Sequence, residues 1–447
     1  MSCIRADGWP VAGNAGPVTE TTGRSDVTAP LTVLVVGQGY VGLPLAMRSV
    51  EVGHRVVGFD TDGRRIKRLG AGDSYIEDVA PAELASALAT GRYQPTSDEA
   101  DCAGFDVALI TVPTPLREGT PDLSFVVAAG ETLGTYLRRG NCVVLESTTY
   151  PGTTEELLAP ILEERSGLVA GEDFHLGFSP ERIDPGNKTW KLENTPKVVS
   201  GVNAASLEAV QSFYGTLVKR TVAVSGTGEA ELAKLIENTF RHVNIALVNE
   251  LAMFAGDLGV DIWEAIEAAA TKPFGFMRFS PGPGVGGHCL PIDPSFLSWR
   301  VKRRIGSPFR FVELANDVNE NMPDYVLHRL MLALNRKARA IRGCRVLLLG
   351  LAYKPNTSDA RESPSLVLAN HLLALGAEVR AADPHVKEGQ FDPRIHLVDL
   401  CEEEVAAADA VVLLTDHDAF DYAVVVAHAS YVLDTRGRLS GDQVERL

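Results

Sequence analysis

The stretch that decides the fold is LTVLVVGQGYVG, residues 31–42. It opens with a mostly apolar, β-branched run that ends at glycine, which is typical of a strand buried on both faces of a parallel sheet. The run continues as GxGxxG and leads into LPLAM, residues 43–47, which we expect to begin a helix. Strand, glycine turn and helix in this order predict an α/β domain that binds the phosphates of a dinucleotide.

An acid at the end of the next predicted strand favours one cofactor over another. Asp60 follows Arg55–Phe59, close to the ~20-residue spacing at which a carboxylate binds a ribose 2′-hydroxyl. A carboxylate there would repel a 2′-phosphate, so we expect NAD rather than NADP, although Arg64 and Arg65 weaken that preference. The residues of this segment that we assign to NAD binding are Gly37, Gly39, Tyr40, Val41, Gly42, Asp60 and Arg65.

Length and composition exclude several classes of protein. At ~150 residues per domain, 447 residues suggest about three domains. The 42 Lys and Arg against 58 Asp and Glu give a net charge of −16, so binding to nucleic acid or an anionic membrane is not expected. The six cysteines form no CxxC pair, which favours reduced thiols in a cytoplasmic protein without a metal site. Residues 1–30 lack the apolar core of a signal peptide, and we expect a disordered leader.

Strand-like and helical stretches alternate in two parts of the chain, which a helical middle separates. Further strands are expected at 107–112 and 142–145 in the first part, and at 345–350, 378–382, 410–414 and 431–433 in the second. Between them, helical spacing predicts a long helix from residue 229 to about 258. The predicted fold is therefore α/β, with two Rossmann-like, doubly wound domains joined by a long central helix and a helical middle domain. The expected domains are 31–222, 223–325 and 326–447.

The most unusual segment is FSPGPGVGGHCLPID, residues 279–293. Its many Gly and Pro residues predict a shaped loop that delivers Cys289 at its end, with Asp293 four residues later. Two interpretations of Cys289 stay open from these residues: a nucleophile, or a small buried hydrophobe, as most free cysteines are. The adjacent His288 does not make a Cys–His pair, because neighbouring side chains usually diverge.

Polar residues recur on one face of the long predicted helix. Lys234, Asn238 and Arg241 fall at i, i+4 and i+7, opposite an apolar side. That apolar side carries Leu232, Ile236, Val243 and Leu247. The polar face is either a solvated stripe or an ammonium and an amide that stabilise an oxyanion in a cleft.

Five other loop segments carry candidate ligand-binding residues. VPTP (112–115) and ESTT (146–149) each follow a strand, at the sheet edge where such folds bind ligands, and supply Thr114, Glu146 and Thr148. SPERIDPGN (179–187) concentrates charge with proline and glycine, and supplies Glu181 and Arg182. LAYKPN (351–356) and DARESP (359–364) follow the first strand of the second part and place Lys354 and Arg361 for an anion. Each loop is otherwise an ordinary surface connection.

In this order the segments resemble the UDP-glucose/GDP-mannose dehydrogenase family, from residue 31 to about 439. The motifs that carry the resemblance are the glycine loop, VPTP, ESTTYPGTTEE, SPERIDPGN, the Lys234–Asn238 helix, GPGVGGHCLPIDP and LGLAYKPNTSDARESPS. The resemblance implies that Cys289 is the nucleophile, that 326–447 binds the UDP-sugar, and that a homodimer forms across the middle domain. It further implies substrate contacts from Glu181, Arg182, Lys234, Asn238, Arg241, Phe279, Gly286, Lys354 and Arg361.

The resemblance implies a four-electron oxidation of a sugar C6 alcohol to a carboxylate with two NAD in succession. Cys289 adds to the intermediate aldehyde, and the resulting thioester is hydrolysed. Lys234 and Asn238 are assigned to the oxyanions at C6. Asp293 and Glu181 are assigned to water activation and proton transfer, and Thr148 to positioning a water or a sugar hydroxyl.

The loops are most similar to those of UDP-N-acetylglucosamine 6-dehydrogenases, through SPERIDPGN and PFGFM, residues 273–277. Arg278 with Phe279-Ser280 departs from that pattern in a loop that shapes the sugar pocket, so the departure concerns the identity of the sugar and not the type of reaction. The alternatives are a UDP-glucose or UDP-N-acetylmannosamine 6-dehydrogenase, a two-electron hydroxyacid dehydrogenase, and a non-catalytic nucleotide-sugar sensor. The sequence leaves the pathway open between polysaccharide or capsule biosynthesis and secondary metabolism.

Overall fold

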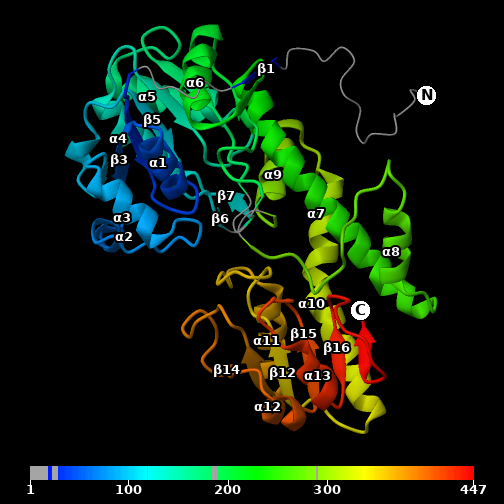
Figure 1. Ribbon diagram of the computed structural model, residues 1–447. Helices are drawn as coiled ribbons and strands as arrows, with labels where there is room; N and C mark the ends of the chain where they lie inside the picture. The colour runs from blue at the N-terminus through cyan, green and yellow to red at the C-terminus, as the bar shows by residue number, and fades with distance from the viewer. Residues whose placement is uncertain (1–18, 23–28, 118, 184–186, 188, 288–289) are drawn as a thin grey trace. The chain divides into compact units, whose positions relative to one another are not determined.

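The computed structural model describes residues 19–22, 29–117, 119–183, 187, 189–287 and 290–447. These residues form two compact units, which Figure 1 shows with their elements labelled. The N-terminal unit holds the described residues up to Glu237 together with Trp299–Gly306. The C-terminal unit holds Asn238–Ser298 and Ser307–Leu447.

The N-terminal unit is built on a six-stranded parallel sheet in the order β4-β3-β2-β5-β8-β9. Numbered along the chain, that is the 3-2-1-4-5-6 order of a doubly wound dinucleotide-binding fold. Its strands are β2 (Thr32–Val36), β3 (Arg55–Phe59), β4 (Tyr93–Thr96), β5 (Val107–Ile110), β8 (Cys142–Leu145) and β9 (His175–Phe178). Chain order reverses between β2 and β5, so the glycine loop after β2 lies at the switch point of the sheet.

Helices connect these strands, and two smaller sheets lie beside them. The connecting elements are α1 (Gly42–Glu51), α2 (Gly63–Gly70), α3 (Pro81–Ala89), η1 (Glu99–Cys102), α4 (Ser124–Tyr136), η2 (Thr154–Leu158), α5 (Ala159–Ser166) and α6 (Ala204–Leu217). A hairpin pairs β6 (Leu116–Arg117) with β7 (Thr120–Pro121). The other small sheet has the order β1-β11-β10, with β10 (Lys197–Val199) and β11 (Arg220–Ala223) parallel.

Strand β1 (Thr19–Thr22) corrects the expectation of a disordered leader over residues 1–30. It is exposed along its whole length and pairs antiparallel with β11, with Thr19 opposite Ala223. The segment TETT has no apolar alternation and left no periodic signal. It is an edge strand beside β11, and an ion pair between Glu20 and Arg220 accompanies the backbone pairing. The other described residues of this range, 29–30, precede β2.

The C-terminal unit repeats the same strand order in a second parallel sheet, β14-β13-β12-β15-β16-β17. The strands are β12 (Arg345–Leu349), β13 (Glu378–Ala382), β14 (His396–Leu397), β15 (Ala410–Leu413), β16 (Val432–Asp434) and β17 (Val444–Arg446). Between them lie α11 (Pro364–Leu375), α12 (Glu402–Ala407) and α13 (Tyr422–His428). Helix α11 begins with proline in its first turn and the Ser363 side chain as N-cap, and it ends at Gly376 in the left-handed region.

The helical middle consists of α7 (Thr227–Asp257), α8 (Ile262–Ala270), α9 (Asp293–Ile305) and α10 (Arg310–Arg336). Helix α7 is continuous, and the division between the two compact units falls within it, after Glu237. The boundary expected after residue 222 falls inside β11, and the one expected after 325 falls inside α10. Neither position is a linker in the structure.

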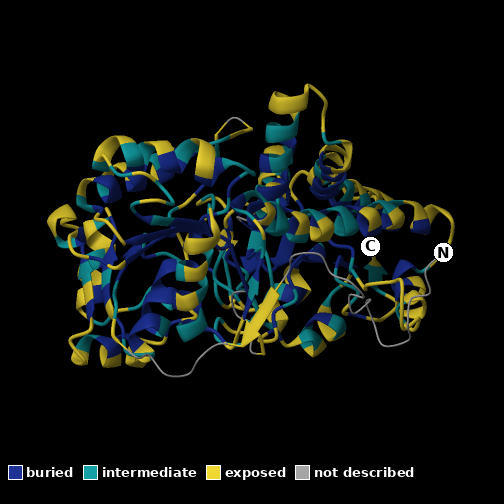
Figure 2. Ribbon diagram, turned by 90° about the horizontal axis from the view of Figure 1, so that it is seen from above, coloured by how far each residue is buried: buried dark blue, intermediate teal, exposed yellow. Residues whose placement is uncertain are grey.

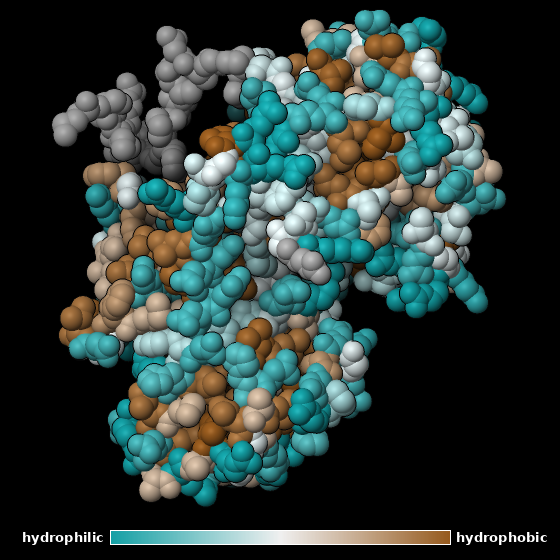
Figure 3. Space-filling model, turned by 180° about the vertical axis from the view of Figure 1, so that it is seen from behind, coloured by the Kyte–Doolittle hydropathy of each residue, from teal (hydrophilic) through white to brown (hydrophobic). Residues whose placement is uncertain are grey.

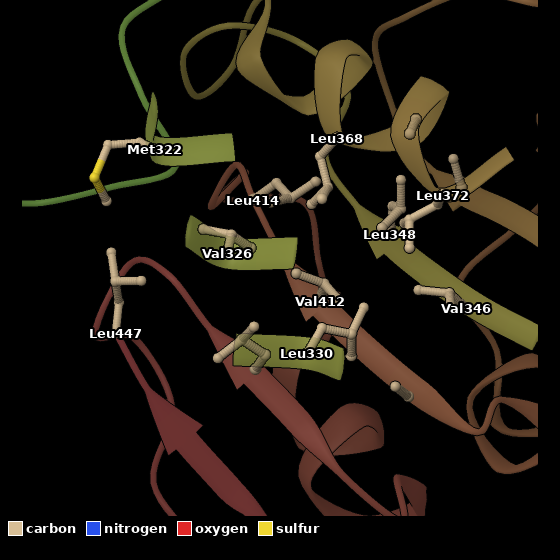
Figure 4. Packing of buried hydrophobic residues seen from close by; sticks show 14 of the residues in the cluster. Met322, Val326, Leu330, Val346, Leu348, Leu368, Leu372, Val412, Leu414 and Leu447 are labelled. Atoms are coloured by element: carbon tan, nitrogen blue, oxygen red, sulfur yellow. The ribbon is translucent and has the colours of Figure 1, made fainter. Parts of the chain in front are cut away.

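Both large sheets are buried on both faces, as the apolar runs predict. In β2, Val33 and Val35 belong to one hydrophobic cluster, whereas Leu34 and Val36 belong to another. Figure 2 shows that the strands are buried, and that the helices around them are exposed on their outer faces. In the C-terminal unit, α10 and α11 cover one face of the sheet, where Val326 and Leu330 pack near Leu348 and Val412 (Figure 4).

The surface is mixed in character. On the face drawn in Figure 3, apolar patches lie among hydrophilic residues. No helix among the described residues is long and apolar enough to cross a membrane.

Candidate active site

The glycine loop after β2 has the geometry that close approach of a ligand requires. Gly37 has φ +95°, and a Cβ there would lie 2.8 Å from the carbonyl oxygen of Thr111. A Cβ on Gly42 would lie 1.9 Å from the carbonyl oxygen of Gly37, so the start of α1 also demands glycine. A Cβ on Gly39, by contrast, would have no atom within 4 Å. The loop therefore leaves open space at its middle glycine, which fits a pyrophosphate that approaches the backbone and the start of α1.

Asp60 joins this loop to the end of β3. Its Oδ2 accepts a hydrogen bond of 2.9 Å from the backbone N–H of Gln38, and its Oδ1 accepts one from Asp62. Arg65 lies 3.5 Å from Asp60, and the exposed Arg64 pairs with Asp62. Both arginines are thus engaged by acids near the position where a ribose would lie. The contact of Asp60 with a ribose stays a prediction.

The two loops after β5 and β8 are held to one another. The Ser147 hydroxyl donates a 2.7 Å hydrogen bond to the carbonyl oxygen of Val112. Thr114 is buried, whereas Thr148 is half-buried. The Thr149 hydroxyl is fully buried and has no hydrogen-bond partner among the described residues. An unpartnered buried hydroxyl beside Thr148 is compatible with the predicted water or substrate position.

Glu146, for which we expected cofactor binding, is engaged within the protein, and its role toward the cofactor stays a prediction. Its side chain is fully buried, Lys197 Nζ lies 2.7 Å from its Oε2, and the Tyr214 hydroxyl donates to its Oε1. Burial raises the pKa of this carboxyl, and Lys197 opposes that effect. Both oxygens are therefore occupied within the protein. The sequence could not reveal this, because Lys197 lies 51 residues further along the chain.

Glu181 lies next to this buried group and faces α7 through its backbone. Lys234 Nζ donates a 2.5 Å hydrogen bond to the carbonyl oxygen of Glu181. The carboxyl Oε2 of Glu181 lies 3.7 Å from Lys197 Nζ and accepts no hydrogen bond within the described chain. Arg182 forms a 2.7 Å ion pair with Glu237 on α7. The structure thus brings the segment with Glu181 and Arg182 against α7, which carries Lys234 about 50 residues further along the chain.

One turn beyond Lys234 on α7, Asn238 meets the start of α9. Its Nδ2 donates a 2.6 Å hydrogen bond to Oδ2 of Asp293, and both side chains are at least 95% buried. Cys289 and His288 lie outside the described residues, so the predicted role of Cys289 stays a prediction. Arg241, expected on the same polar face, is exposed. The described residues leave part of the apolar side of α7 uncovered: Ile236 is 56% and Leu247 53% exposed, whereas Leu232 and Val243 are half-buried.

The described part of the glycine-rich loop packs tightly within the C-terminal unit. The backbone N–H of Gly282 donates a 2.9 Å hydrogen bond to Asn249 on α7. A Cβ on Gly286 would lie 2.6 Å from the carbonyl oxygen of Glu362, and one on Gly287 2.7 Å from the Tyr353 ring. These glycines therefore permit close packing of the loop against 353–364. Phe279 is half-buried and packs edge-on against Phe240.

Lys354 and Arg361 lie in the crossover that follows β12. Arg361 is exposed and forms a 2.6 Å ion pair with Asp359. Lys354 Nζ lies 5.9 Å from the centre of the Tyr353 ring. The residues that sequence reasoning missed here are Asp383, at the end of β13, and His417, after β15. Asp383 ends its strand as Asp60 ends β3, and that similarity was the available signal.

Comparisons with known proteins agree with this architecture. Three sequence models of the UDP-glucose/GDP-mannose dehydrogenase family match the chain: the NAD binding domain over residues 31–218, the central domain over 228–321 and the UDP binding domain over 347–441. These matches confirm the expected NAD cofactor. Among the described residues, no group of three or more His, Cys, Asp or Glu could hold a metal ion.

Individual relatives cover most of the chain. UDP-N-acetyl-D-mannosamine dehydrogenase of Pyrococcus horikoshii is 37% identical over 391 residues, which are 87% of this chain and 90% of that protein. UDP-N-acetyl-D-glucosamine 6-dehydrogenase of Pseudomonas aeruginosa is 38% identical over 394 residues, 87% and 91% respectively. The solved structure of UDP-D-ManNAc dehydrogenase from P. horikoshii is similar with a TM-score of 0.85 and 35% identity, covering 93% of this chain and 99% of that one. The predicted fold of two Rossmann-like domains and a helical middle is confirmed.

Proposed function

This chain belongs to the UDP-glucose/GDP-mannose dehydrogenase family, and from that membership we propose that it oxidises the C6 alcohol of a UDP-N-acetylhexosamine to a carboxylate with NAD. The observation that carries the proposal is the buried Asn238–Asp293 hydrogen bond, one helical turn from Lys234 and at the end of the cysteine loop. An amide, an ammonium and a carboxylate at these places supply the donors and the base that oxidation at a carbonyl carbon requires.

We propose UDP-N-acetylglucosamine as the substrate, on the resemblance of SPERIDPGN and PFGFM to enzymes of that branch. Similar proteins carry names for both epimers, UDP-N-acetyl-D-glucosamine and UDP-N-acetyl-D-mannosamine. UDP-N-acetylmannosamine is therefore the second candidate. One or two hydrogen bonds in the pocket distinguish such epimers.

The glycine loop fits NAD, since Gly39 leaves room for the pyrophosphate and Asp60 offers a carboxylate at the ribose position. NAD, when bound, supplies the hydride acceptor for both oxidation steps. Gly37, Gly42 and the start of α1 would hold its phosphates, with Thr114 at the neighbouring strand end.

In the proposed mechanism the protein supplies the nucleophile, the oxyanion donors and the bases. Cys289 as thiolate adds to the C6 aldehyde, because an aldehyde carries no leaving hydride until a nucleophile has added. Lys234 and Asn238 donate to the oxygen at C6, where negative charge develops in both halves of the reaction. Asp293, held by Asn238, accepts a proton from the water that hydrolyses the thioester. Glu181 is the second carboxylate assigned to proton transfer, and its Oε2 accepts no hydrogen bond in the described chain.

The test is to count NADH formed per sugar consumed with purified protein and, separately, UDP-N-acetylglucosamine, UDP-N-acetylmannosamine, UDP-N-acetylgalactosamine and UDP-glucose. We expect two NADH per UDP-N-acetylglucosamine and little turnover of UDP-glucose. Preference for the mannosamine sugar would keep the chemistry and change the substrate. One NADH with accumulating aldehyde would contradict the role of Cys289.

We further propose a homodimer across the helical middle. Apolar residues that follow helical spacing along one face of α7, and one residue directly after its end, are exposed in the single chain: Ile236, Phe240, Leu247, Leu251, Phe254 and Leu258. We call these six residues the α7 stripe. A continuous exposed apolar stripe is typical of a protein interface.

A further inference from the structure

The imidazole of His417 is fully buried at the carboxyl edge of the second sheet, four residues after β15. Its Nδ1 lies 3.0 Å from the backbone nitrogen of Asn356. A backbone N–H can only donate, so Nδ1 must be the acceptor and carries no proton. The ring proton therefore resides on Nε2, which lies 3.1 Å from Oδ2 of Asp383. The contacts select one tautomer of a neutral ring.

Asp383 accepts the hydrogen bond from the other nitrogen of this ring. Its Oδ2 accepts hydrogen bonds from the backbone N–H groups of Leu351 (2.7 Å) and Ala352 (3.0 Å). Its Oδ1 accepts from His385 and Val386. Burial alone would raise the pKa of this carboxyl, but the hydrogen bonds from His417 and the backbone outweigh burial and hold the pKa well below its ordinary value. Asp383 is thus an ionised acceptor that favours the Nε2–H form of His417.

Asn356 is held on its other side as well. Its Nδ2 donates a 2.8 Å hydrogen bond to Asp418, and its Oδ1 accepts a 3.0 Å hydrogen bond from the backbone N–H of Asp418. Asn356 has φ +58°, in the left-handed region that non-glycine residues seldom occupy. Its contacts with His417 and Asp418 stabilise this conformation. Asn356 follows Lys354 by two residues, so the conformation at Asn356 sets where the Lys354 backbone runs.

We propose that His417 is a positioning residue for the nucleotide end of the substrate: its Nδ1 holds the backbone of Asn356 and thereby presents Lys354 to the diphosphate of a uridine nucleotide. The inference rests on the proposed function, which assigns Lys354 to the UDP-sugar. His417 itself touches neither the reacting carbon nor, in this assignment, the nucleotide. Loss of a contact that is equally strong in the ground state and the transition state raises KM and leaves kcat unchanged, and we expect this of the diphosphate contact.

The experiment measures UDP binding to the full chain by titration calorimetry and compares three substitutions of His417. An asparagine amide can place its oxygen near the Nδ1 position, where it accepts from Asn356. A glutamine amide can reach the Nε2 position, where it donates to Asp383. We expect His417→Ala to raise the Kd for UDP roughly tenfold, as loss of one buried hydrogen bond predicts. His417→Asn should recover most of that loss, and His417→Gln should not.

Two variants separate this inference from the proposed function. Lys354→Ala should weaken UDP binding on its own, and His396→Ala, at an exposed histidine of β14, should leave it unchanged. If the wild-type chain does not bind UDP, the proposed function fails and this inference fails with it. If Lys354→Ala weakens binding but His417→Ala does not, only the inference is overturned. Rescue by glutamine instead of asparagine would also overturn it.

Two further readouts address chemistry and folding. In turnover, His417→Ala should raise KM for the UDP-sugar about tenfold and keep kcat within about twofold. If the variants do not fold, nitrogen chemical shifts of the labelled wild-type histidines decide the premise. A protonated Nε2 and bare Nδ1 at His417 support the inference, and a protonated Nδ1 overturns it.

Discussion

At the scale of single residues, the proposed chemistry rests on polar groups that are buried and hydrogen-bonded. Asn238 and Asp293 are 55 residues apart in sequence but share a 2.6 Å hydrogen bond. Hydrogen bonds to a charged group contribute about 1.5–3 kcal/mol, and this one fixes the direction in which the carboxylate points. Asp60 is fixed in the same way by Gln38, at the edge where the cofactor is expected.

Asp60→Ala should weaken NAD binding roughly tenfold to hundredfold and narrow the preference over NADP. The variant removes the predicted acceptor for the ribose and the carboxylate that would repel a 2′-phosphate. It also removes the acceptor of the Gln38 N–H, which adds to the loss with both cofactors. The measurement is kcat/KM for NAD and for NADP, with Asp62→Ala as the control. An unchanged ratio would place the ribose contact on another residue.

Cys289→Ser should stop the reaction after the first oxidation, because a hydroxyl is a far weaker nucleophile than a thiolate. The expected result is about one NADH per sugar, with aldehyde trapped by a hydrazine reagent. Cys401→Ser, at a half-buried cysteine of the second sheet domain, is the matched control and should behave as wild type. Full conversion to the acid by the Cys289 variant would contradict the covalent mechanism.

At the scale of elements, the long helix α7 carries Lys234 and Asn238, two residues of the candidate site. Near its start, the buried Glu231 accepts hydrogen bonds from the backbone N–H groups of Gly152 and Thr154 and from the Thr154 hydroxyl. This carboxylate therefore ties α7 to the loop after β8 and to the start of η2. Glu231 lies about one helical turn before Lys234, so these hydrogen bonds hold the part of α7 that carries Lys234.

Glu231 should make stability depend on pH. Burial raises its pKa from 4.5 to about 7, since desolvation outweighs its hydrogen bonds. The folded state therefore binds this proton more tightly than the unfolded state. Its contribution is fully present below pH 4.5 and is lost as the pH rises to about 7, a change of about 3 kcal/mol.

Urea unfolding at pH 5, 6, 7 and 8 measures this effect. Glu231→Gln, which cannot ionise, should remove that part of the pH dependence, and Glu229→Gln at an exposed position of the same helix should retain it. Equal pH profiles for wild type and Glu231→Gln would show that the carboxyl titrates at its ordinary value.

The α7 stripe gives the second prediction at this scale. Leu251→Glu places a charge on an apolar face, so it should raise the dissociation constant of the dimer at least tenfold. Monomers should then predominate at concentrations where the wild-type chain is dimeric. Light scattering across a concentration series measures the change. Asp257→Ala, outside the α7 stripe, should not alter the mass. A wild-type chain that is monomeric throughout would contradict the proposed dimer.

At the scale of the whole molecule, two sheets with the same strand order divide the ligands between them. NAD should protect amides within residues 31–218 from hydrogen exchange, and UDP should protect amides within 347–441. At a hundredfold excess over Kd, each ligand should add about 2.7 kcal/mol to the stability of what it binds. Hydrogen-exchange mass spectrometry with each ligand alone tests this assignment. Protection of the first segment by UDP alone would contradict it.

Much of this architecture could be predicted, because the central strands are continuous apolar runs and the glycine turn follows the first of them. Arg55–Phe59 and Cys142–Leu145 have the expected bounds. Edge strands such as β14, with only two residues, leave no periodic signal. Helix α10 runs without a break from Arg310 to Arg336 although it contains Pro323, a residue that disfavours the interior of a helix. The sequence therefore does not predict this helix as one element. The side of α7 with Ile236 and Leu247 was predicted as apolar, but periodicity cannot say what covers such a face.

Residues of the candidate site could be predicted where they belong to a sequence motif. The burial and the hydrogen-bond partners of a residue could not be predicted where they depend on segments far away in the sequence. Lys234, Asn238 and Asp293 came from motifs, and the structure joins the last two. The partners of Glu146 could not be predicted, since Lys197 and Tyr214 come from other segments. No local pattern reports such a pairing.

The buried Glu146–Lys197 pair also constrains how this sequence can change over evolutionary time. Replacing Lys197 alone leaves Glu146 without its cation in the interior, and breaking a buried pair in this way costs about 3–5 kcal/mol. That is a large share of the stability of an ordinary domain. Replacing Glu146 first costs less, because Lys197 keeps Glu181 at 3.7 Å. Descendants of this chain should therefore lose Lys197 only together with Glu146 or after it.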